Sequence, residues 1–200
     1  MKFVILRLAQ RWRRLKRSYY FRKFLWLEGL STKNFTVSRE TTFDVPVHCG
    51  GLGSLQIAPG NSFGYWAGPM FGNGAILIQP RSPASKIEIG SKNCFSNNVT
   101  IVANQQITIG DACQIGDQVT IYDCDFHEIP PSSRNASAGS TKPVYIGNNV
   151  WLGSRVMILK GVSIGDNSVI GAMSLVTKSI PANCVATGIP AKIVRSIEGR

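Results

Sequence analysis

Charged side chains are scarce in this chain of 200 residues, since they make up 16% of it, against about a quarter in ordinary globular domains. Histidine occurs twice, and no apolar run reaches the roughly 18 residues that span a bilayer. The five cysteines form no CxxC pair and share no zinc-ligand spacing with histidine. We therefore expect no metal site and no membrane-spanning segment, and free thiols in a reducing compartment.

Acidic residues are nearly missing from the first thirty positions, which hold nine basic residues and one acidic residue, a net +8 of the chain's +11. The rest of the chain carries only +3, so the charge does not indicate a nucleic-acid-binding domain. Arg7 and Arg11 interrupt the apolar start, so no signal peptide is indicated and the cytoplasm is the expected location.

Residues 2–29 predict one basic amphipathic helix that ends at Gly29. Its apolar positions lie on one side of a helix, three or four residues apart and seven between the last two: Ile5, Leu8, Trp12, Leu15, Tyr19 and Trp26. Such a helix either makes a peripheral contact with a membrane, here through residues 1–28, or packs on its own domain or on a partner subunit. The spacing alone does not separate these two interpretations.

A six-residue repeat is the main feature of the rest of the chain. Apolar residues recur at every sixth position in three runs: Ile89, Phe95, Ile101; Ile109, Ile115, Ile121; and Ile146, Leu152, Ile158, Ile164, Ile170, Val176. Glycine often follows directly, and we expect it to supply the backbone freedom of a tight turn. Three hexads predict a triangular coil, and stacked coils predict a prism with columns of inward side chains. The shorter runs Phe43–Val47, Ser54–Ala58 and Ala75–Gln79 predict irregular strands and loops.

The chain resembles the hexapeptide-repeat acetyltransferases, in particular the galactoside/maltose O-acetyltransferases and the capsule and lipopolysaccharide sugar O-acetyltransferases. The resemblance rests on His127 and on four segments: 143–153, 161–172, 176–181 and 188–195. It implies a mainly β fold, a left-handed parallel β-helix with an N-terminal amphipathic α-helix. We expect a helix over 1–30, the β-helix over 31–195 with an active-site loop at 123–144, and a tail at 196–200.

The resemblance also implies a reaction, the transfer of an acetyl group from acetyl-CoA to a saccharide hydroxyl in a ternary complex. His127 is the implied general base, and Trp151 is expected to pack near it or to line the acceptor site. Related enzymes carry a Glu eleven residues after the histidine, where this chain has Ala138. We therefore expect Asp123, or else Asp125, to orient the imidazole, with turn capping as the alternative role of either carboxylate.

Further residues carry over from the resemblance as binding residues. The implied coenzyme A contacts are Ser154, Ala172, Thr177, Lys178, Lys192 and Arg195, and the implied acceptor contacts are Asn97, Asn98 and Asp125. Cations near a polyanion such as coenzyme A make electrostatic sense, although each is otherwise an ordinary solvated charge. Asn97 and Asn98 have stacked turn asparagines as their alternative interpretation. The binding groove of the family implies a homotrimer.

Three interpretations of the function remain open from the sequence. The favoured one is a sugar O-acetyltransferase of bacterial surface polysaccharide biosynthesis. The second is an N-acetyltransferase of an amino sugar, which needs less help from a base. The third is a non-catalytic β-helix scaffold, which the presence of His127 and of the coenzyme A-matching C-terminal segment argues against.

Overall fold

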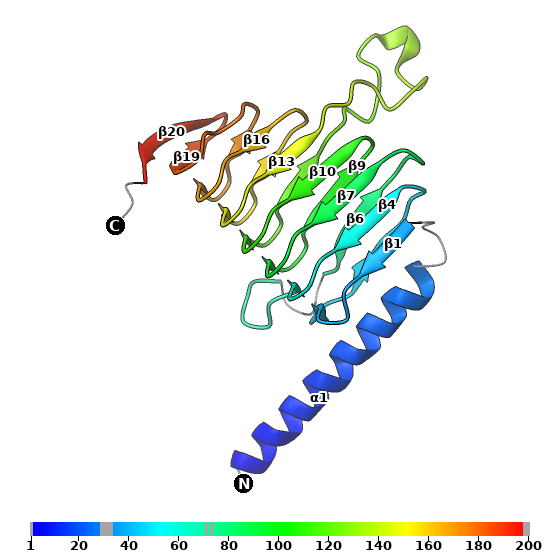
Figure 1. Cartoon of the computed structure of the whole chain (residues 1–200), viewed down its shortest axis with the longest axis vertical. Helices are drawn as coiled ribbons and strands as arrows, with labels where there is room; N and C mark the ends of the chain where they lie inside the picture. Colours follow the sequence, from blue (N-terminus) through cyan, green and yellow to red (C-terminus); the bar gives the residue numbers. More distant parts are fainter. Residues whose placement is uncertain (1, 29–33, 71, 73, 198–200) are drawn as a thin grey trace.

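The computed structural model describes residues 2–28, 34–70, 72 and 74–197. Three parallel sheets wrap around one core, with six, eight and six strands among the described residues. The predicted fold class, a left-handed parallel β-helix with an N-terminal helix, is confirmed (Figure 1). The predicted helix stop at Gly29 and the last three residues of the predicted tail lie outside the described residues.

Each turn of the chain places one strand in each sheet. The first sheet holds β1 (Asn34–Val37), β4 (Ser54–Ile57), β7 (Lys86–Ile89), β10 (Gln106–Ile109), β13 (Val144–Ile146) and β16 (Ser163–Ile164). The second holds β2 (Thr42–Phe43), β5 (Ser62–Phe63), β8 (Cys94–Phe95), β11 (Gln114–Ile115), β14 (Trp151–Leu152), β17 (Val169–Ile170), β19 (Cys184–Gly188) and β20 (Ala191–Ser196). The third holds β3 (Val47–His48), β6 (Ile76–Pro80), β9 (Thr100–Ala103), β12 (Thr120–Tyr122), β15 (Met157–Ile158) and β18 (Leu175–Val176).

The regular coils begin earlier than the sequence indicates. Residues 31–80 predict irregular strands and loops, yet β1 to β6 are in register with the later coils, as the pairs Leu55↔Ile87 and Phe63↔Phe95 show. Phenylalanine occupies the inward positions Phe43 and Phe63, and both side chains are fully buried. The six-residue pattern misses these coils because the long segment between β5 and β6 interrupts the spacing and glycine seldom follows the inward residue.

The glycines of the repeat act through close approach rather than through backbone freedom. The left-handed conformation falls on the third residue after the inward apolar one, as at Asn149 (φ 53°) and Asn167 (φ 60°). A Cβ on Gly147 would lie 2.2 Å from Oδ1 of Asp166 in the next coil. That oxygen accepts a hydrogen bond from the backbone N–H of Asn148 at 2.7 Å. The glycine therefore makes room for a side-chain ladder between coils, which corrects the expectation that it supplies turn flexibility.

The helix α1 (Lys2–Lys23) and the π-helical turn that follows it (Phe24–Glu28) cover the β1 end of the stack (Figure 1). Phe24 is buried against Phe43, with ring centroids 4.9 Å apart, and a column of rings continues through Phe63 to Phe95. The helix thus extends the apolar core of the prism by one further ring. No helix in the described part of the chain is long and apolar enough to cross a membrane.

Two arginines fix α1 to the first coil through one buried carboxylate. Arg13 and Arg17 each donate two hydrogen bonds to Asp44, over 2.6 to 3.0 Å. Burial of Asp44 opposes its ionisation, but the hydrogen bonds and charges of the two guanidinium groups outweigh that effect, so the pKa of Asp44 lies below its usual value. Two interpretations of the helix were left open. The face that carries Arg13 and Arg17 packs on the helix's own domain, as one of them predicts.

Candidate active site

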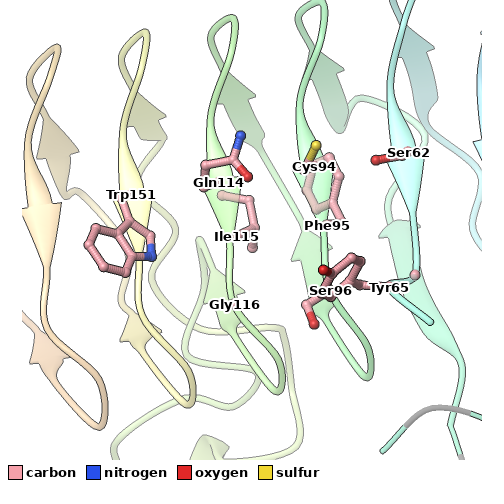
Figure 2. A pocket seen from close by; sticks show the side chains of 10 residues that line it. Ser62, Tyr65, Cys94, Phe95, Ser96, Gln114, Ile115, Gly116 and Trp151 are labelled. Atoms are coloured by element: carbon pink, nitrogen blue, oxygen red, sulfur yellow. The ribbon is translucent and has the colours of Figure 1, made fainter. Parts of the chain in front are cut away.

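A shallow hollow of about 370 Å³ lies on the outer face of the second sheet. Ser62, Cys94, Gln114 and Trp151 are register partners along β5, β8, β11 and β14, and they form one outward column (Figure 2). The neighbouring positions are small, as at Gly64, Ser96 and Gly116. The hollow exists because these short side chains lie between two aromatic side chains, Tyr65 and Trp151, which are 54% and 56% exposed.

Asn97 holds the segment that carries Tyr65. Its Oδ1 accepts from the backbone N–H of Tyr65 at 3.1 Å, and its Nδ2 donates to the carbonyl oxygens of Tyr65 and Pro69 at 3.0 and 2.7 Å. The side chain is fully buried, so its amide has no group left for a ligand. Asn98 adopts the left-handed conformation of a corner residue. The structure therefore supports the turn interpretation of Asn97 and corrects the expectation that it contacts the acceptor. The acceptor contact of Asn98 stays a prediction.

The predicted loop projects from the corner between the third and first sheets, between β12 and β13 (Figure 1). It carries His127, whose imidazole is exposed and whose Nδ1 lies 3.3 Å from the carbonyl oxygen of Arg134. A carbonyl oxygen only accepts hydrogen bonds, so this contact requires the proton on Nδ1 and leaves the lone pair on Nε2. The same carbonyl oxygen accepts from the N–H of Glu128 at 3.1 Å, which fixes its direction.

Asp123 does not orient His127, and this expectation is corrected. Its carboxylate is fully buried and accepts hydrogen bonds from the backbone N–H groups of Asn104, Gln105 and Gln106, each at 2.7 Å. These three N–H groups belong to the corner of the preceding coil. Asp123 is therefore the anchor at the base of the loop, because it ties the departing chain to that corner.

Asp125 forms an ion pair with Lys160, which lies at the same corner in the next coil. The Asp125 side chain is still 29% exposed, so its assignment as a substrate contact stays a prediction. Phe126 packs edge-on against Tyr122, with ring centroids 4.8 Å apart, and the guanidinium of Arg81 lies 4.9 Å above the Phe126 ring. These contacts hold the segment that leads to His127.

His127 and Trp151 lie on opposite sides of the prism. His127 projects from the corner between the third and first sheets, and that corner faces away from the second sheet, which carries Trp151. His127 is accordingly not among the residues that line the hollow beside Trp151. One chain by itself does not bring the predicted base and the predicted aromatic together.

The coenzyme A candidates divide among three places. Ser154 and Ala172 occupy one corner in successive coils, and Ser154 donates a hydrogen bond to the buried Asp117. Thr177 and Lys178 follow β18 at the corner that also carries the His127 loop, and both are exposed. Lys192 and Arg195 are exposed on β20, which pairs antiparallel with β19 at the end of the stack.

Two of the buried thiols, those of Cys113 and Cys124, are poor nucleophiles. Burial raises the pKa of the Cys113 and Cys124 thiols, which keeps them protonated. Within the residues that the structure describes, no three His, Cys, Asp or Glu side chains are grouped so that they could hold a metal ion.

Three groups of the candidate site could not be predicted from the sequence: Tyr65, Lys160 and the carbonyl group of Arg134. Tyr65 lies in a segment of glycines and aromatics without a regular pattern. Lys160 is an outward residue of its hexad, and the six-residue repeat does not predict which residue type occupies an outward position. A backbone carbonyl acts whatever side chain it belongs to, so no motif could mark it.

Comparisons with known proteins show what the chain is similar to. Residues 143–178 match the family described as bacterial transferase hexapeptide (six repeats). The chain is 47% identical to the galactoside O-acetyltransferase of Escherichia coli (strain K12) over 120 residues. The aligned region covers 60% of this chain and 58% of that relative. The chain spans 58% and 60% of the lengths of two curated galactoside O-acetyltransferases that it matches.

Two solved structures are similar over most of the chain. One is a galactoside acetyltransferase in complex with coenzyme A, with 34% identity and a TM-score of 0.54, covering 84% of this chain and 66% of that one. The other is the polySia specific acetyltransferase NeuO, with 28% identity and a TM-score of 0.58, covering 85% of this chain and 81% of that one.

Proposed function

We propose that this chain, a hexapeptide-repeat protein similar to the galactoside O-acetyltransferases, transfers the acetyl group of acetyl-CoA to a saccharide hydroxyl. The contact between Nδ1 of His127 and the Arg134 carbonyl carries the proposal, because it leaves Nε2 as a base on an exposed loop. The similarity to a galactoside acetyltransferase complexed with coenzyme A supports the choice of donor. The coenzyme A contacts carried over from the family, including Ser154 and Lys178, remain part of this proposal.

The proposed reaction is a direct transfer in a ternary complex. Nε2 of His127 takes the proton of the hydroxyl while the oxygen attacks the thioester carbonyl carbon. The tetrahedral intermediate then collapses, the C–S bond breaks, and the imidazolium returns the proton to the leaving thiolate of coenzyme A. No acyl group is attached to the protein at any stage. Holding both substrates in line supplies further rate enhancement through proximity.

We propose a homotrimer in which neighbouring chains complete each site. The supporting observation is that His127 and Trp151 lie on opposite sides of one prism, so a neighbour's loop must reach the hollow beside Trp151. A closed ring of three chains repeats the same contact three times. The exposed rings of Tyr65 and Trp151 then supply apolar faces for a saccharide ring.

The acceptor we propose is a bacterial surface polysaccharide or its precursor. The hollow is open, with aromatic side chains on two sides, which suits a chain of sugar rings better than an enclosed pocket would. The similarity to a polySia specific acetyltransferase supports a polymeric acceptor. An amino-sugar N-acetyltransferase is the alternative, and a free amine would depend less on His127 than a hydroxyl does.

Release of coenzyme A thiol from acetyl-CoA, measured across a panel of sugar acceptors, tests the proposal. We expect acceptor-dependent release by the wild-type chain and its loss in His127→Ala. Absence of acceptor-dependent release, or full activity of His127→Ala on a hydroxyl acceptor, would overturn the O-transfer mechanism. Activity that survives His127→Ala on amino sugars alone would favour the N-transfer alternative.

Mixing two impaired variants tests the shared site, with activity measured at a saccharide concentration far below KM, where Trp151→Ala alone keeps about a tenth to a fifth of the wild-type rate. His127→Ala and Trp151→Ala chains, mixed in equal amounts and reassembled, should recover about a quarter of the wild-type activity, because a random trimer pairs an intact His127 with an intact Trp151 at that frequency. Each variant alone stays low. No recovery in verified mixed trimers would place both residues of a site on one chain.

A further inference from the structure

The helix α1 has a second apolar face that the prism does not use. Its packing face consists of Arg13, Arg17 and Phe21, together with Phe24 of the π-helical turn, which contact Asp44 and Phe43. Trp12, Leu15 and Tyr19 recur at helical spacing on another face. Trp26 of the π-helical turn lines the same hollow as Leu15 and Tyr19, so the four residues form a separate stripe. All four are exposed, Trp12 by 72% and Trp26 by 71%. We call these four residues the outer stripe.

The outer stripe is hollowed and bordered by basic side chains. Leu15, Tyr19 and Trp26 line a shallow hollow of about 660 Å³ together with Ser18, Arg22 and Lys23. Arg11 and Arg22 are exposed beside the stripe on one flank, and Lys23 on the other. Tryptophan and tyrosine rings have apolar bodies and polar tips, which suits them to the boundary between water and hydrocarbon. The stripe thus joins interfacial aromatics with cations along one helix.

The position of the helix keeps this face turned outward. The two arginine pairs with Asp44 and the burial of Phe24 fix the rotation of α1 about its axis. The outer stripe cannot turn onto the prism without breaking those contacts. Figure 1 shows α1 at the β1 end of the stack, extending past the strands, so a flat surface could approach the helix without meeting the His127 loop.

The charge distribution decides what kind of surface fits. Residues 1–30 carry a net charge of +8 and residues 31–200 carry +3. Both parts of a second copy of this chain are therefore positively charged, like the helix itself. A negatively charged surface that also accepts aromatic side chains is complementary in both respects. An anionic lipid bilayer has these properties, since its headgroups attract Lys and Arg and its interface accommodates Trp and Tyr.

We propose that the outer stripe of α1 is a docking surface for an anionic lipid bilayer. The helix lies in the plane of the interface, with Trp12, Tyr19 and Trp26 inserted at headgroup level and Arg11, Arg22 and Lys23 against the lipid phosphates. Docking holds the prism at the membrane surface. The proposal does not depend on the chemistry assigned to His127, because it uses none of the same residues.

Flotation of the full-length chain with vesicles tests the proposal. We expect binding to phosphatidylglycerol/phosphatidylcholine vesicles, weak binding to phosphatidylcholine alone, and a decrease with added salt. Trp12→Ala/Trp26→Ala and Arg11→Gln/Arg22→Gln should each lower the partition coefficient by about tenfold or more. The matched controls are Tyr145→Ala/Met173→Ala and Lys92→Gln/Arg155→Gln, which change exposed apolar and basic residues of the prism.

The results separate the possible occupants of the stripe. Wild-type chain that stays with the aqueous phase, or helix variants that bind vesicles like the controls, would overturn the proposal. A helix variant whose assembly loses mass in solution would show that a second copy covers the stripe, which also overturns it. Acetyl transfer to a water-soluble acceptor should be unchanged in the helix variants, so failure of this proposal is distinct from failure of the proposed enzyme activity.

Discussion

The imidazole of His127 is held by a backbone carbonyl, that of Arg134, with 3.3 Å between Nδ1 and the oxygen. This neutral acceptor replaces the carboxylate that the resemblance led us to expect. A carboxylate would both fix the tautomer and stabilise the imidazolium, whereas a carbonyl group fixes the tautomer with a partial charge only. The proposed base therefore depends on loop geometry more than on a buried negative charge.

Replacement of His127 by Ala should lower kcat for O-acetyl transfer by about 10²- to 10⁴-fold, the range of a positioned general base. The free energy of unfolding should change little, because the imidazole is exposed. Thiol release at saturating substrates measures the first effect and urea unfolding the second. Arg134→Ala is the matched control, since it keeps the carbonyl group, and a comparable loss of kcat in that variant would contradict the backbone assignment.

Asp123→Ala should destabilise the base of the loop rather than change the acid–base chemistry. Three partly buried backbone N–H groups lose their acceptor, which costs about 1 to 3 kcal/mol of unfolding free energy. Activity should fall with an unchanged shape of the pH–rate profile. A displaced profile together with normal stability would mean that Asp123 acts on His127 after all.

Asp44→Asn should lower the free energy of unfolding at neutral pH by about 2 kcal/mol, because two guanidinium groups lose their partner while remaining partly exposed to water. The pKa of Asp44 is lowered in the folded chain, so its stabilising effect is complete above the unfolded value near 4 and is lost as the pH falls through the folded value. The difference between wild type and variant should thus shrink in acid. Denaturant titrations at several pH values measure it, with the exposed Glu40→Gln as the control.

Trp151→Ala and Tyr65→Ala should raise the KM for the saccharide by about five- to tenfold, the value of one lost aromatic contact. The KM for acetyl-CoA should change less in Tyr65→Ala, because the hollow lies apart from Lys192 and the corner residues of the later coils. Initial-rate kinetics with both substrates varied distinguish these effects. Met157→Ala alters an exposed side chain on the third sheet and should leave the saccharide KM at its wild-type value.

The fold could be predicted from the sequence because the repeat is local. An inward residue at every sixth position determines which side chains are buried, so the spacing alone assigns Ile109, Ile115 and Ile121 to the core, where all three lie. The loop and its histidine were predictable for a related reason, since a break in a regular repeat marks an insertion. The first coils were harder, because the long segment between Phe63 of β5 and Ile76 of β6 interrupts the six-residue spacing.

The partners of individual polar groups were not predictable. Asp123 precedes His127 by four residues, yet its carboxylate points to a corner formed by residues 104–106. Asp125 is closer still in sequence and is paired with Lys160, thirty-five residues away. Proximity along the chain says little about side-chain direction where a loop leaves a coil.

The helix also determines where the stack of coils stops. A β-helix is an open-ended arrangement in which each strand edge is a template for the next, and an uncovered end can pair with another molecule as edge strands do. Phe24 occupies the place that an inward side chain of a preceding coil would take, above Phe43. Asp44 in that first coil is engaged by the helix rather than by another strand turn. The helix within residues 1–30, which carry most of the chain's net charge, thereby also covers the end of the stack and prevents end-to-end growth of prisms into filaments.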